Sequence, residues 1–113
     1  MALYYDLPVY RDTYQLILKI FEVTKDFPRE YKYSLGQDMK RDAMQLVRSI
    51  YRANKSADKK EALENFLDEF ELLKLQIRLC ADMKILSLTK QAELSLLMEG
   101  IGKQITGWRN ASQ

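Results

Sequence analysis

The sequence predicts an all-α fold, an up-down-up-down four-helix bundle. Apolar residues recur at helical spacing in four segments, and no segment alternates in the way that a half-buried strand does. The 113 residues contain only four glycines and two prolines, which favours long helices joined by short connections. An apolar share of 47% with 30% charged residues is typical of a globular chain. We therefore expect residues 1–113 to form one domain.

The first helix is expected from about residue 7 to residue 25. Asp6 is a candidate N-cap, and Pro8 lies in the first turn, where proline is tolerated. Pro28 interrupts the helical pattern, so residues 26–33 are predicted to form a connection. The apolar stripe that would face the core consists of Val9, Thr13, Leu16, Ile17, Ile20 and Val23.

The second and third helices carry equally clear apolar faces. The second is expected over residues 34–55, with Ser34 or Tyr33 at its start. Its predicted core face is formed by Leu35, Met39, Ala43, Leu46, Val47 and Ile50. The third is expected over residues 59–86. Its predicted core face is formed by Leu63, Phe66, Leu67, Phe70, Leu73 and Ile77.

Polar residues before the third and fourth helices are candidate caps. Ser56 and Asp58 precede the third helix, and Ser87 precedes the fourth, which is expected over residues 88–108. The core face of the fourth helix is predicted to consist of Leu94, Leu97, Met98, Ile101, Ile105 and Trp108.

The third helix also carries apolar residues on its outer side. The first half of that side is acidic, whereas the second half is apolar at a spacing of three or four residues: Leu72, Leu75, Leu79, Met83 and Leu86. Small monomers rarely expose such a patch, so we expect self-association. The facing surface is expected on the aromatic flank of the first helix, at Tyr10, Tyr14 and Phe21. The alternative is that the helical angles drift and some of these leucines belong to the core.

Histidine, which many catalytic and metal sites need, is missing from the sequence. The chain has no histidine, which is the commonest general base and metal ligand, so the Glu-x-x-His di-iron site of other bundles is impossible. A site built from carboxylates alone stays open. Cys80 is expected to be a small apolar filler rather than a nucleophile. We expect no enzyme activity, no cofactor and no metal.

The cysteine count and the apolar runs also bear on location. A single cysteine excludes an intramolecular disulfide and fits a reducing compartment. The segment MALYYDLPVY lacks the basic and apolar regions of a secretory signal. No segment has the roughly 18 consecutive apolar residues that indicate a membrane span. We expect a cytoplasmic protein with no membrane contact.

A basic stripe runs along the outer side of the second helix. Residues 34–55 carry five basic and two acidic residues in a chain of net charge +2. Four of the basic residues fall within an arc of about 60°, and Lys40 flanks them. The stripe consists of Arg41, Arg48, Arg52 and Lys55. Charged faces are usually only solvated, but the planar guanidinium of arginine suits phosphate, and an oligomer would repeat the stripe and raise its avidity.

The segment FPREYKYSLGQDMKRDAM, residues 27–44, resembles the signature of a bacterial four-helix-bundle family. That family contains the proteins encoded by intervening sequences in large-subunit ribosomal RNA genes, and Avd, the accessory variability protein of diversity-generating retroelements. The runs YSLGQ (residues 33–37) and ELLKLQIRLCADMKILS (residues 71–87) are closer to Avd. The intervening-sequence proteins usually have an Asn-Ile-Ala-Glu-Gly run where this chain has SIYRANK (residues 49–55), which also favours Avd.

The resemblance implies a pentameric barrel of four-helix subunits with a basic surface. By that resemblance the protein partners a reverse transcriptase, binds RNA and possibly DNA, and has no catalysis of its own. We expect phosphate contacts from the basic stripe, and additional ones from Lys40 and Arg78. The alternative is an oligomer of the ribosomal intervening-sequence type that acts as a structural scaffold without affinity for nucleic acid.

Overall fold

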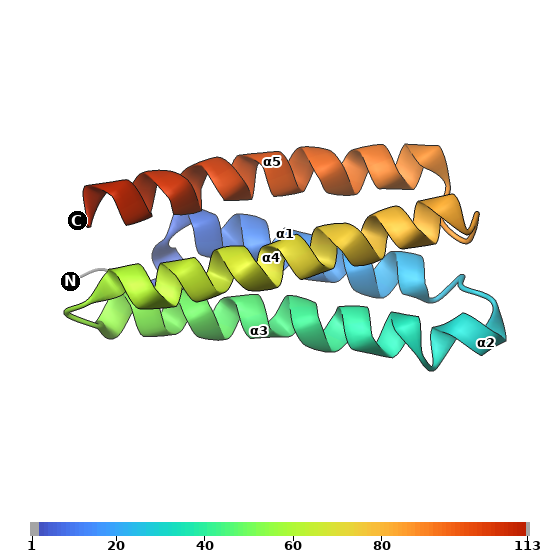
Figure 1. The fold of residues 1–113 in the computed structure, drawn as a ribbon, viewed down its shortest axis with the longest axis horizontal. Helices are drawn as coiled ribbons and strands as arrows, with labels where there is room; N and C mark the ends of the chain where they lie inside the picture. The colour runs from blue at the N-terminus through green and yellow to red at the C-terminus, as the bar shows by residue number, and fades with distance from the viewer. Residues whose placement is uncertain (1–2, 113) are drawn as a thin grey trace.

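Four long antiparallel helices make up most of the computed structural model, which describes residues 3–112. The helices are α1 (Pro8–Thr24), α3 (Leu35–Lys55), α4 (Lys59–Asp82) and α5 (Leu88–Ala111). Successive long helices run in opposite directions, which confirms the predicted all-α fold and its up-down-up-down order (Figure 1). A 3-10 turn, η1 (Tyr4–Asp6), precedes α1, and the one-turn helix α2 (Arg29–Lys32) lies within the predicted connection. The described residues contain no strand.

Each long helix packs against two neighbours. Helix α1 contacts α3 and α5, and α4 contacts the same two helices. Consequently α1 and α4 lie across the bundle from each other, as do α3 and α5. The bundle measures 43 × 22 × 21 Å, and the 24 residues of α4 account for most of its length at 1.5 Å per residue. This arrangement leaves four outer corners, one on each long helix.

The core lies along the bundle axis and is formed by the predicted stripes. Burial of each of these aliphatic or aromatic side chains stabilises the fold by about 1.5–3 kcal/mol before entropy is counted. The fully buried large side chains include Leu16, Ile20, Met39, Leu46, Ile50, Leu63, Phe66, Phe70, Leu73, Leu94, Ile101 and Ile105. Six predicted core residues are only partly buried, namely Ile17, Leu35, Val47, Leu67, Leu97 and Trp108.

Two of the predicted helix caps, Asp58 and Ser87, form, whereas the side chains of Asp6, Ser34 and Ser56 do not cap the helix that follows. Ser56 follows the last residue of α3, and its hydroxyl donates to the Asp58 carbonyl at 2.8 Å. Asp58 and Ser87 accept hydrogen bonds from the backbone N–H groups of Lys60 and Lys90, each at 3.2 Å, and so begin α4 and α5. Asp6 does not cap α1, because it ends η1 and Leu7 takes the N-cap position without a side-chain bond.

Ser34 precedes α3, but its hydroxyl donates to the Glu30 carbonyl at 2.9 Å. The Ser34 side chain therefore bonds back to the preceding turn, α2, and leaves the N-terminal N–H groups of α3 uncapped by this residue.

Helix α4 ends at Asp82, four residues earlier than the sequence predicts. Lys84 adopts a left-handed backbone conformation with φ 62°. The Ile85 N–H donates to the Cys80 carbonyl and the Lys84 N–H to the Ala81 carbonyl, each at 3.0 Å, which is a Schellman motif. The prediction of an outward Leu86 is therefore wrong, because the chain turns after Asp82 and places Leu86 in the core with 5% exposure.

Candidate nucleic-acid interface

Helix α3 presents the basic stripe on the outer corner of the bundle. Its buried face, which runs from Met39 to Ile50, fixes the opposite face toward solvent, and all four stripe residues are exposed. Arg48 and Arg52 have no ion pair with any residue in the described range 3–112. Their guanidinium groups are thus available for an external anion.

Arg41 differs from the other two arginines because two carboxylates neutralise it. Its Nη1 lies 3.3 Å from Asp38 Oδ1, and its Nε lies 3.5 Å from Asp42 Oδ1. Asp42 also accepts a hydrogen bond from Gln76 Nε2 at 2.9 Å, which ties it to α4. Exposed pairs of this kind add little stability, yet they cancel the local positive charge. The effective positive end of the stripe is therefore Arg48 to Lys55.

The structure does not bring Lys40 and Arg78 onto the stripe. Lys40 is half-buried, with its Nζ 5.4 Å from the centre of the Phe21 ring on α1. Arg78 lies on α4 with its Nε 3.8 Å from Asp82 Oδ2, and it lines a groove between α4 and α5. These two cations therefore face other parts of the surface than the stripe.

An acidic wall borders the stripe on the side of α4. Arg48 and Arg52 line a groove of about 280 Å³ together with Asp68 and Glu69 of α4. Glu69 Oε1 accepts a hydrogen bond from Ser49 at 2.7 Å, which holds this carboxylate in the wall. Because these carboxylates repel phosphate, an anionic chain on the stripe would lie away from α4.

A tyrosine cluster borders the stripe on the other side. The Tyr4 ring contacts the rings of Tyr5, Tyr10 and Tyr51 edge to face, with centroids 5.4, 5.4 and 5.2 Å away. Lys55 Nζ lies 4.6 Å from the centre of the Tyr51 ring. Periodicity within one helix could not predict this cluster, because η1 and α3 are far apart in the sequence. The only available signal was the aromatic content of the segment MALYYDLPVY.

The outer side of α4 exposes three of the five predicted apolar residues. Leu72, Leu75 and Leu79 are 47%, 61% and 45% exposed, and we call them the leucine face. Met83 is partly buried beyond the end of α4, whereas Leu86 belongs to the core as described above.

The predicted facing surface on α1 is exposed at Tyr14 and Phe21 and half-buried at Tyr10. Leu18 and Met44 are also exposed and were not predicted. Leu18 lies on α1 and makes the exposed apolar surface of that helix wider than the sequence indicated, whereas Met44 lies on the outer side of α3.

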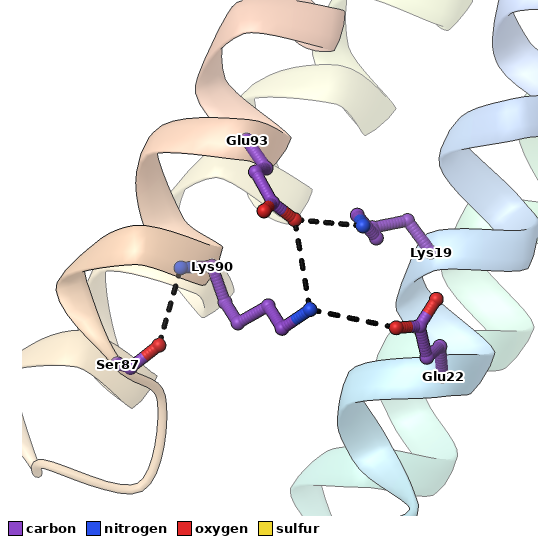
Figure 2. Close-up of polar contacts among 5 residues, drawn as sticks. All are labelled: Lys19, Glu22, Ser87, Lys90 and Glu93. Atoms are coloured by element: carbon purple, nitrogen blue, oxygen red, sulfur yellow. Dashed lines mark hydrogen bonds and ion pairs between the residues drawn. The ribbon is translucent and has the colours of Figure 1, made fainter.

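Ion pairs join α1 to α5 on the side away from the stripe. Lys19 Nζ lies 2.7 Å from Glu93 Oε2, and Figure 2 shows Lys90 between Glu93 and Glu22. The hydrogen bond from Lys19, aided by the charges of Lys19 and Lys90, holds the pKa of Glu93 below its usual range. The same hydrogen bond raises the pKa of Lys19. The network joins α1 to α5, and its four members lie on these two helices.

The single cysteine of the chain lies in the core. Cys80 is fully buried, its Sγ lies 3.6 Å from Met39 Sδ, and burial raises its pKa to about 11. The thiol therefore stays protonated near neutral pH, as expected for an apolar filler.

Within residues 3–112, no three cysteine or carboxylate side chains gather closely enough to hold a metal ion. No helix of the described chain is long and apolar enough to cross a membrane.

Comparison with known proteins gives one family. A family model described as bAvd-like matches residues 9–112, which include all four long helices. A search of curated proteins gave no match.

Proposed function

This chain belongs to the bAvd-like family, and on that premise we propose that it is a non-catalytic accessory protein of a diversity-generating retroelement. It forms a homo-oligomer, binds RNA or DNA through the basic stripe, and holds the nucleic acid beside a partner reverse transcriptase. The observation that carries this proposal is the pair Arg48 and Arg52, two exposed guanidinium groups without carboxylate partners in the described chain.

The stripe suits phosphate contacts better than base recognition. Arg48, Arg52 and Lys55 follow one side of α3 at intervals of four and three residues, so their charges form a line rather than a pocket. A line of cations positions a phosphate backbone and carries no sequence code. We therefore expect binding that depends steeply on salt and weakly on sequence.

Two different apolar surfaces support assembly into a ring. The leucine face lies on α4, and the aromatic surface with Tyr14 and Phe21 lies on α1, across the bundle. An interface that joins unlike faces repeats head to tail, and it closes into a ring when the rotation allows. The resemblance to Avd favours five subunits.

Such a ring would keep every stripe accessible. Helices α3 and α5 lie on the two corners that an α1–α4 interface leaves free. On α5 the exposed side chains of Lys103 and Glu99 neutralise each other at a distance of 3.3 Å. Positive charge without carboxylate partners would accumulate on the α3 side, where neighbouring stripes together raise the affinity for one nucleic-acid strand.

Fluorescence anisotropy tests this proposal, with labelled RNA titrated at low and moderate salt and the mass of the same sample measured by light scattering. The variant Arg48→Glu with Arg52→Glu should remain helical and oligomeric and lose most of its affinity. Unchanged affinity would place the site elsewhere on the molecule.

A matched control separates the stripe from overall charge. Lys25→Glu with Lys60→Glu reverses two other exposed cations that have no ion pair in the described chain. In both double variants the formal net charge falls from +2 to −2, because each reversal changes it by two. The control should keep clearly more affinity than the stripe variant.

The alternative is a scaffold oligomer without affinity for nucleic acid. Neutralised Arg41 and the acidic wall of Asp68 and Glu69 favour this alternative, because both lower the potential around the stripe. An oligomer that ignores RNA at low salt would support it. Co-purification with a reverse transcriptase encoded beside the gene would support the accessory role instead.

A further inference from the structure

Two rings of the tyrosine cluster remain partly exposed to solvent in the folded chain. Tyr4 is the half-buried hub, and it contacts Tyr5, Tyr10 and Tyr51 at near-perpendicular angles. Tyr5 and Tyr51 are 50% and 43% exposed. Edge contacts with the hub hold these two rings in place and leave much of their surface in water.

The cluster is continuous with the basic stripe. Arg48, Tyr51 and Lys55 occupy positions i, i+3 and i+7 of α3, so they follow one another along one side of the helix. Lys55 Nζ already lies 4.6 Å from the centre of the Tyr51 ring. A cation that binds a phosphate and a ring that stacks a base are thus next to each other.

The charges on either side of the stripe are unequal. On the α4 side, Glu61, Asp68 and Glu69 line the grooves that hold Arg52, Arg48 and Lys55. On the η1 side the neighbours are the rings of the tyrosine cluster. The acidic wall repels phosphate, so a nucleic-acid strand on the stripe is displaced away from α4 and toward the rings.

We propose that the stripe and the tyrosine cluster together form a binding site for single-stranded nucleic acid. Arg48, Arg52 and Lys55 hold phosphates, while the rings of Tyr51 and Tyr5 stack on unpaired bases. This inference rests on the proposed function and narrows it. A duplex hides the faces of its bases, whereas a single strand can offer them to aromatic rings regardless of sequence.

The test compares a labelled 15-nucleotide polyuridine with an RNA duplex of 15 base pairs under the same salt conditions. The variants are Tyr51→Leu and Tyr5→Leu, which remove a ring, and Tyr51→Phe, which keeps one. Tyr33→Leu is the control, since Tyr33 is 66% exposed at the start of α3, at the opposite end of that helix from Lys55. Circular dichroism and light scattering on each sample check helicity and mass.

The wild type should bind the single strand more tightly than the duplex. Each leucine variant should lose about fivefold or more in affinity for the single strand, because stacking of one base is worth at least that factor. Affinity for the duplex should change little. Tyr51→Phe and Tyr33→Leu should behave like the wild type.

Three results would overturn the inference, and they are distinguishable. If the wild type binds single strand and duplex equally and the leucine variants change neither, the stripe acts without the rings and the proposed function stands alone. If the leucine variants lower the mass of the oligomer while RNA affinity per chain is kept, the cluster is a protein interface. If the wild type binds no RNA, the inference and the proposed function both fail.

Discussion

The leucine face gives the sharpest prediction about assembly. We expect Leu75→Glu with Leu79→Glu to yield smaller particles that remain fully helical. The exposed fractions of these two side chains, 61% and 45%, together amount to about one whole leucine. Burial of one leucine is worth about 1.5–3 kcal/mol, so each interface should weaken by about tenfold to a hundredfold. The cost of burying two carboxylates adds to this loss.

The assay is light scattering after size exclusion over a range of protein concentrations. The control is Leu88→Glu with Leu96→Glu, which introduces the same charges on α5 at side chains that are 78% and 73% exposed. The control should keep the mass of the wild type, because the proposed ring leaves the α5 corner free. A leucine-face variant with unchanged mass, or a wild type that is monomeric at every concentration, would refute the reasoning.

Three further predictions concern the chain itself. Lys84→Gly should raise the free energy of unfolding by about 0.5–1 kcal/mol, because glycine adopts a positive φ without strain; Lys84→Ala in the same denaturant titration should have no such effect. Glu93→Gln should reduce the stability that the protein loses in acid. The pKa of Glu93 is lowered in the folded protein, so its carboxylate contributes stability above about pH 4.3, and this contribution is lost as the pH falls through the folded pKa. Thermal melts of both proteins from pH 6 to pH 3 would show the difference. The Cys80 thiol, with a pKa of about 11, should react with a disulfide reagent only after denaturation, and rapid reaction of the native protein would contradict its burial.

The helices and the core could be predicted because their signal is local. Side chains such as Leu16, Leu46 and Phe66 recur at the helical period, and burial follows that period directly. The end of α4 could not be predicted in the same way. The Schellman turn usually carries glycine at the left-handed position, but this chain has Lys84 there, so the apolar pattern of the sequence continues to Leu86 without a helix-stop signal.

The sequence predicts which cations form the candidate site, but it does not predict which residues surround them. The spacing of Arg48, Arg52 and Lys55 along one helix placed them together on the surface. Contacts between distant segments decide what lies beside them. The approach of Tyr4 to Tyr51 and the groove shared by Arg48 and Asp68 both depend on how η1 and α4 pack against α3.

The salt dependence of RNA binding tests the central claim most directly. The wild type is compared with the double variant Arg48→Gln with Arg52→Gln, and the oligomer mass of both proteins is measured. Three phosphate contacts on each engaged subunit should lower the affinity about 20-fold between 50 and 200 mM salt, since the slope is about −0.7 for each contact to a single strand. With two contacts removed, the same change in salt should cost only about threefold for each engaged subunit. Equal slopes in the two proteins, or no binding at 50 mM salt, would contradict a phosphate site on the basic stripe.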